Sequence, residues 1–135
     1  MVDAARVESV PCFAALRPDI RVALAAAFDE VEISATESVA SQGDFAYELF
    51  AILDGTARVE QDGTVLATLG PGDLFGEVGL VLTGRRTATV VAETPMVLLT
   101  MFDQPFRRLS KDHPDFLDVV RNQCRERFRG PTAPV

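Results

Sequence analysis

Residues 75–90 read FGEVGLVLTGRRTATV, and this stretch is the most informative part of the chain. A glycine, Gly76, lets the backbone come close to a ligand, and the acid Glu77 follows at once. One apolar turn later Arg86 enters a β-rich segment, so an anion on the amides of that turn would meet a guanidinium on its other side. A carboxylate cannot bind phosphate, but it can accept a hydrogen bond from a sugar hydroxyl. The stretch therefore indicates a site for a phosphorylated sugar, as in a nucleotide.

The same pattern resembles the phosphate-binding cassette of the cyclic nucleotide-binding domain family, with the spacing of that family and no insertion or deletion. We call residues 75–88 the cassette. The similarity extends from about Phe13 to Phe128 and includes Gly43-Asp44, LFAILDG at 49–55 and LGPGDLFGE at 69–77. The run GRRTA at 84–88 looks closest to the cassettes of the pacemaker channels and some bacterial relatives.

The resemblance implies roles for individual residues. Arg86 would pair with the cyclic phosphate, because its planar fork matches two phosphate oxygens and stays charged. Glu77 would accept from the ribose 2′-hydroxyl, and backbone amides near Gly79 and Leu80, in a cassette turn over residues 78–81, would meet the phosphate. The predicted ligand-binding set is Phe75, Gly76, Glu77, Val78, Gly79, Leu80, Arg86, Thr87, Ala88 and Arg127.

Two members of this set keep two interpretations each. Thr87 stands where a threonine is associated with contact to guanine in the family, but it is equally a good β-strand residue. Arg127 stands where pacemaker-type channels place an arginine over the purine, and a solvated arginine is the competing interpretation. Arg85 is expected to point to solvent. Gly79 replaces the usual alanine of the family, which predicts a looser turn, and Thr36 replaces a usual glycine.

The spacing of apolar residues along the chain predicts the architecture. Residues 10–28 are apolar at helical spacing, with a break at Pro18-Asp19, and Asp103 is a candidate N-cap of a helix that ends near Asp112, before another helix begins at Pro114. Between them lie short β-type runs, and Asp62-Gly63 is a hairpin signal. These runs are 31–33, 47–53, 57–59, 65–69, 87–92 and 96–102. We predict an α+β fold: an eight-stranded antiparallel β-jelly roll with a short phosphate-binding-cassette helix, an N-terminal helical segment and two C-terminal helices.

Length and composition narrow the function. The 135 residues suit one domain, 1–135, with a core over about 10–129 and a disordered tail at 130–135. Cys12 and Cys124 have no metal or redox spacing, which favours a cytoplasmic protein. A net charge of −7 makes nucleic acid an improbable partner, and no apolar run approaches the roughly 20 residues of a membrane span.

Catalysis is not expected. The single histidine, His113, cannot build the metal site of a cupin-like enzyme or a credible nucleophile triad, so no catalytic residue, metal or cofactor is predicted. The 19 residues after Phe116 are too few for the helices of a DNA-binding module.

The sequence thus predicts a sensor that binds cAMP or cGMP reversibly and acts on an effector domain or protein outside this chain. Its last helix, 114–129, would move as a lid. The alternative is a degenerate sensor fold that acts as an interaction domain.

Overall fold

Two antiparallel sheets packed around an apolar cluster form the body of the domain. The computed structural model describes the backbone of residues 1–129 and the side chains of residues 1–123. Within them lie two four-stranded antiparallel sheets, in the orders β1-β8-β3-β6 and β2-β7-β4-β5. The strands are β1 (Asp29–Ile33), β2 (Ser38–Ala40), β3 (Glu48–Asp54), β4 (Ala57–Gln61), β5 (Thr64–Leu69), β6 (Leu74–Phe75), β7 (Thr89–Ala92) and β8 (Met96–Phe102). This is the predicted antiparallel jelly roll.

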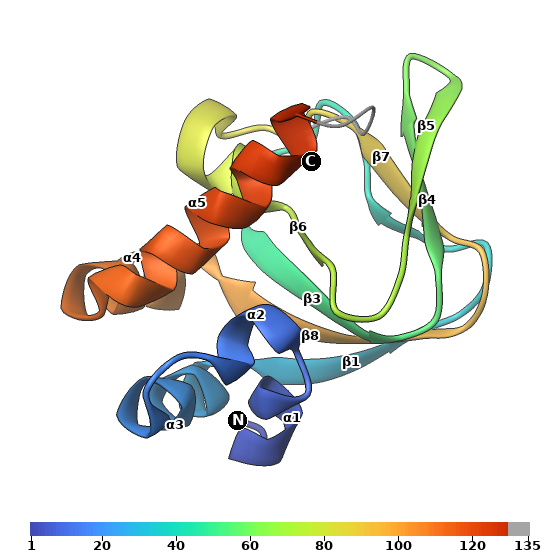
Figure 1. Ribbon diagram of the computed structural model, residues 1–135. Helices are drawn as coiled ribbons and strands as arrows, with labels where there is room; N and C mark the ends of the chain where they lie inside the picture. The colour runs from blue at the N-terminus through green and yellow to red at the C-terminus, as the bar shows by residue number, and fades with distance from the viewer. Residues whose placement is uncertain (130–135) are drawn as a thin grey trace.

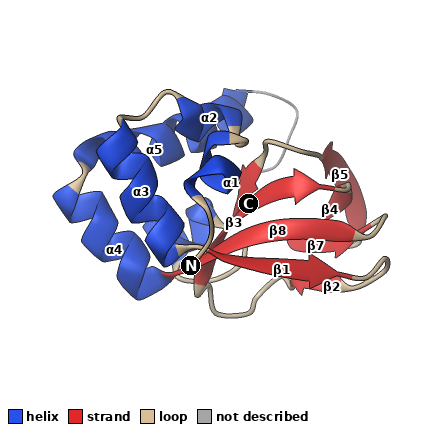
Figure 2. Ribbon diagram, turned by 90° about the horizontal axis from the view of Figure 1, so that it is seen from below, coloured by secondary structure: helices blue, strands red, loops and turns tan. Residues whose placement is uncertain are grey.

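The helices gather on one side of the roll, as Figure 2 shows. They are α1 (Ala4–Glu8), α2 (Pro11–Ala14), α3 (Pro18–Ala27), α4 (Asp103–Asp112) and α5 (Pro114–Arg129), together with the π-helical turn η1 (Gly79–Thr83). In Figure 1 the helices α1 and α3 lie below β1, and α5 runs upward past η1. No helix in the described part of the chain is both long and apolar enough to cross a bilayer.

Strand β3 shows how the sequence builds two cores. Its central residues are all apolar. Because successive side chains of a strand point to opposite faces of the sheet, this one strand contributes to two cores. Leu49 and Ala51 belong to the cluster shared with the helices, whereas Phe50 and Ile52 belong to the cluster between the two sheets. The predicted helical positions that pack on the first cluster are all buried: Phe13, Leu16, Ile20, Leu24 and Phe28.

Three features differ from the sequence-based expectation. The helix α1 was not predicted, because it has only five residues and buries only Val7. The strands β2 and β6 were also missed, because strands of three and two residues carry no recognisable period. Asp103 is not the N-cap of α4 but its first residue, since Phe102 occupies the cap position and no side chain caps it. Asp103 still lies in the first turn, where the negative charge of an acid interacts favourably with the helix dipole.

Other local predictions are confirmed. Asp62 and Gly63 take φ values of 52° and 81° between β4 and β5, as a two-residue hairpin turn requires. The break at Pro18 is the start of α3, with the proline in its first turn. Thr36 holds φ at 75°, in the left-handed region that favours the glycine it replaces, and such strain costs on the order of 1–3 kcal/mol. The tail predicted at 130–135 lies outside the described residues.

Candidate functional site

The cassette leaves β6 through a backbone conformation that only glycine adopts easily. Gly76 has φ at 92°, and a Cβ there would lie 2.7 Å from both Nη1 of Arg86 and the carbonyl oxygen of Glu48. The helical turn that follows is η1, placed at Gly79–Thr83 rather than at the expected 78–81. It closes when the Gly84 N–H donates to the Gly79 carbonyl at 2.7 Å, an i→i+5 bond. Turns of this π type are rare and occur frequently at functional sites.

Arg86 is held inside the roll by backbone carbonyls. Its side chain is 8% exposed, and it donates from Nη1 to the Gly76 carbonyl at 3.3 Å and from Nη2 to the Glu48 carbonyl at 3.1 Å. The guanidinium carbon also lies 5.3 Å from the centroid of the Phe50 ring. These contacts fix the plane of the guanidinium, which is the requirement for a two-pronged contact with an anion.

The charge of Arg86 is balanced by two neighbouring carboxylates. Burial lowers the pKa of the Arg86 guanidinium below its ordinary value, and the Glu48 and Glu77 carboxylates oppose that shift. Glu77 is completely buried, which is exceptional for an acid. Arginine remains charged at neutral pH. The cassette therefore buries a cation and an acid side by side, next to a glycine.

Six of the predicted residues line one small cavity. Its volume is about 10 Å³, about enough for one water molecule, so a nucleotide would extend beyond it. Its walls are Ala40, Phe75, Gly76, Gly79, Arg86, Thr87, Ala88 and Val90. Arg86 and Ala40 also line a neighbouring pocket of about 400 Å³, which is bounded by residues 38–48 of β2, β3 and their connection.

The other predicted site residues are not among those that line this cavity. Glu77 and Val78 are buried beside the cavity, and Leu80 belongs to the core cluster shared with the helices. The Leu80 N–H donates to the Gly76 carbonyl at 3.3 Å, so this amide is already used within the turn. The side chain of Arg127 lies outside the described residues. Arg85 is exposed as expected, although it donates to the Gly43 carbonyl at 3.0 Å and covers the Phe45 ring at 4.0 Å.

Sequence reasoning missed two residues that shape this site, Glu48 and Ala46. Glu48 holds Arg86 through a backbone carbonyl, and no side-chain pattern reports such a contact. Ala46 faces Gly79: a Cβ on Gly79 would lie 2.6 Å from the Cβ of Ala46 and 3.1 Å from the Arg85 carbonyl oxygen. Gly79 is therefore a position where a side chain would not fit without a shift of its neighbours. The looser turn expected from its lack of a side chain stays a prediction.

We expect Gly79→Ala to destabilise the domain by about 1–3 kcal/mol, because the added methyl group overpacks against Ala46. In an Ala46→Gly background the same change should cost clearly less, since the nearest obstacle is gone. Urea unfolding of the four proteins of this double-mutant cycle measures the coupling. Strict additivity of the two changes would show that the two positions do not press on each other.

Comparisons with known proteins place the chain in one family. Residues 30–113 match the sequence profile described as "Cyclic nucleotide-binding domain". The chain belongs to the cyclic nucleotide-binding domain family. It is 39% identical over 124 residues to a cAMP-dependent protein kinase regulatory subunit of Schizosaccharomyces pombe, covering 90% of this chain and 29% of the relative.

Two further similarities show how widely such domains occur. A cyclic nucleotide-gated potassium channel of Mesorhizobium japonicum is 31% identical over 94% of this chain and 35% of its own length. The crystal structure of the Thermus thermophilus catabolite activator protein superposes with a TM-score of 0.77 at 30% identity, covering 88% of this chain and 58% of that one. The chain thus spans about a third of the length of these two curated relatives.

Proposed function

We propose that this domain binds a 3′,5′-cyclic nucleotide reversibly and acts as a sensor module. The buried Arg86 beside Gly76 is the observation that carries the proposal. Burying a guanidinium costs free energy unless its charge is paired and hydrogen-bonded. Here two backbone carbonyls accept hydrogen bonds from the guanidinium and orient it at the wall of a cavity. The phosphate of the nucleotide would be the anion with which this oriented guanidinium pairs.

The remaining cassette residues have proposed roles in the same complex. Glu77 would accept a hydrogen bond from the ribose 2′-hydroxyl, and the backbone of η1 would surround the phosphate together with Gly79. Ala88 and Phe75 would line the floor under the sugar and phosphate, since both are buried at the cavity wall. The domain would act without catalysis, in the cytoplasm, and would pass the signal to an effector domain or protein.

We propose that both cAMP and cGMP are accepted. Thr87 lines the cavity next to Arg86, and its hydroxyl can donate and accept, which suits guanine groups that adenine lacks. The two nucleotides should therefore bind within about tenfold of each other, a difference of roughly 1.4 kcal/mol. Arg127, in α5, is proposed to reach over the purine.

The contact between Glu77 and the sugar can be isolated with a modified ligand. We expect 2′-deoxy-cAMP to bind wild-type protein at least about tenfold more weakly than cAMP, since a hydrogen bond to a charged group is worth about 1.5–3 kcal/mol. On Glu77→Gln the same ligand change should cost clearly less. Calorimetric titration of both ligands on both proteins measures this. Losses that simply add would show that Glu77 and the 2′-hydroxyl do not meet.

Ligand-dependent movement of α5 is proposed for its second half. The first half is already anchored, because Phe116 and Val120 are fully buried and the Phe116 ring lies 6.0 Å from Phe13 and 5.7 Å from Phe106. The sequence predicted that the whole helix, residues 114–129, moves as a lid. We now propose that only residues 121–129 move. The proposal is a change in population between two arrangements of this segment.

Hydrogen exchange tests this movement. On adding cAMP, amide exchange should slow most at residues 121–129, whereas residues 114–120 should be protected with or without ligand. The β3 strand, at the centre of its sheet, serves as the internal reference. Unchanged exchange across 121–129 at saturating cAMP would remove the lid from the mechanism.

A further inference from the structure

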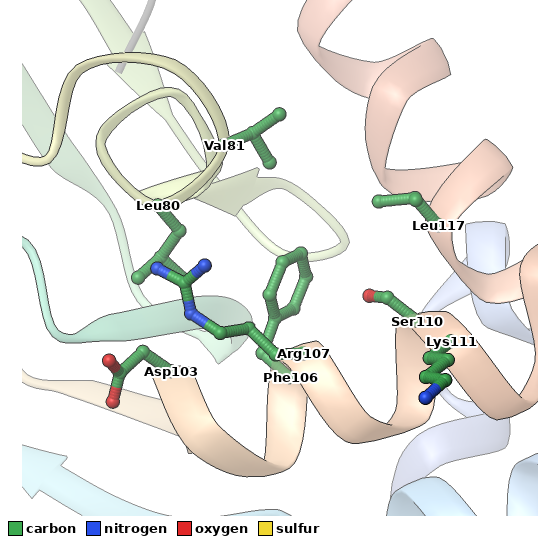
Figure 3. Close-up of a pocket in the computed structure, with 8 residues that line it drawn as sticks. All are labelled: Leu80, Val81, Asp103, Phe106, Arg107, Ser110, Lys111 and Leu117. Atoms are coloured by element: carbon green, nitrogen blue, oxygen red, sulfur yellow. The ribbon is translucent and has the colours of Figure 1, made fainter.

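A third pocket lies against the outer face of the cassette turn. Its volume is about 320 Å³, within the range of about 300–1,000 Å³ that is usual for small-molecule sites. It shares no lining residue with the Arg86 cavity. Figure 3 shows the three elements that form it: η1 supplies Leu80 and Val81, α4 supplies five residues, and α5 supplies Leu117.

The centre of this pocket is apolar and contains one unsatisfied hydroxyl. Leu80, Val81, Phe106 and Leu117 form the apolar walls. The Oγ of Ser110 is buried and makes no hydrogen bond within the described part of the chain. In Figure 3 this hydroxyl points into the gap between Phe106 and Leu117. A buried hydroxyl without a partner is unfavourable, so a ligand that reached it would gain by supplying an acceptor.

The rim of the pocket carries a net positive charge, although the whole chain carries −7. Arg107 and Lys111 contribute two cations and Asp103 contributes one acid, which leaves a single positive charge. Neither cation is in an ion pair with another described residue. Figure 3 shows the Arg107 guanidinium reaching up toward Leu80, on the other side of the Phe106 ring from the Ser110 hydroxyl in this view. One net positive charge complements a monoanion and leaves a dianion half neutralised.

We propose that this pocket binds a small organic acid that combines one carboxylate with an apolar chain or ring. The carboxylate would accept a hydrogen bond from the Ser110 hydroxyl, and the exposed Arg107 side chain would turn toward it to pair the charge. The apolar part would lie between Phe106 and Leu117, against the outer side of the cassette turn. Guanidinium and hydroxyl donors above an apolar wall are the groups that recognise an amphipathic carboxylate. This site stands on its own residues and does not depend on cyclic nucleotide binding.

Decanoate is the probe that tests the site, titrated by calorimetry into the nucleotide-free protein. We expect saturable one-to-one binding, and octanoate should bind more weakly by about fourfold for each buried methylene group that it lacks. Decyltrimethylammonium, with the same chain and the opposite charge, should not compete. Chemical shifts of the methyl groups of Leu80, Val81 and Leu117 should move, whereas those of Val65 on β5 should not.

Arg107→Gln and Arg108→Gln form a matched pair for the same titration. Both arginines are exposed on α4, and only Arg107 lines the pocket. Arg107→Gln should weaken decanoate binding by about tenfold, and Arg108→Gln should leave it unchanged. The proposal is overturned by an absence of saturable decanoate binding, by equal losses in the two variants, or by decyltrimethylammonium binding as well as decanoate.

Discussion

Arg86→Ala is expected to weaken cAMP binding by roughly 30-fold or more, because removing one partner of a buried charge pair costs about 2–5 kcal/mol. The reason lies in the geometry of the wild type. Arg86 is buried, and its guanidinium is oriented by the carbonyls of Gly76 and Glu48 before any ligand arrives. Calorimetric titration with cAMP measures the loss.

The control for this experiment is the neighbouring residue. Arg85→Ala removes an arginine of the same cassette whose side chain is exposed and contacts Gly43 and Phe45 instead of the cavity. It should change cAMP affinity by less than about threefold, which is under 1 kcal/mol. A thermal unfolding curve establishes that each variant is folded. A folded Arg86→Ala protein that binds cAMP like Arg85→Ala would contradict the phosphate role.

Gly76→Ala is expected to destabilise the domain by about 2–5 kcal/mol, the sum of two effects. A left-handed backbone costs a residue with a side chain about 1–2 kcal/mol, and overpacking a filled space costs about 1–3 kcal/mol more. The added methyl group would meet Arg86 Nη1 and the Glu48 carbonyl oxygen, each 2.7 Å away. Urea unfolding measures the free-energy difference.

Gly43→Ala separates the two effects. Gly43 has nearly the same φ, 88° against 92°, but no atom lies within 4 Å of the position of an added Cβ. This variant should lose only the backbone part, about 1–2 kcal/mol. The excess loss in Gly76→Ala is then the packing cost at the cassette. If the two variants lose equal stability, Gly76 is not packed against Arg86.

The cassette could be recognised from sequence because its pattern consists of a few residue types at fixed spacing. Gly76 and Arg86, ten positions apart in the chain, line one cavity, and their role in ligand binding stays a prediction. The cores could be predicted for a similar reason: helical spacing identified Phe13 and Phe28, and both are fully buried.

What the sequence did not reveal depends on backbone geometry. The carbonyl of Glu48 orients Arg86, and any residue has a carbonyl, so the residue type carries no signal. The fit of Gly79 against Ala46 depends on how closely two segments approach across 33 positions of the chain. A family pattern with alanine at that position could not predict the contact. The short strand β6 is defined by its pairing with β3 and not by a period of its own.

One titration tests the central claim most directly. The purified domain is titrated with cAMP, with cGMP and with 5′-AMP, which has the same base and sugar but an open, doubly charged phosphate. We predict saturable one-to-one binding of both cyclic nucleotides, within about tenfold of each other, and at least about tenfold weaker binding of 5′-AMP. A folded domain that takes up neither cyclic nucleotide at millimolar concentration, or that binds 5′-AMP equally well, would contradict the account.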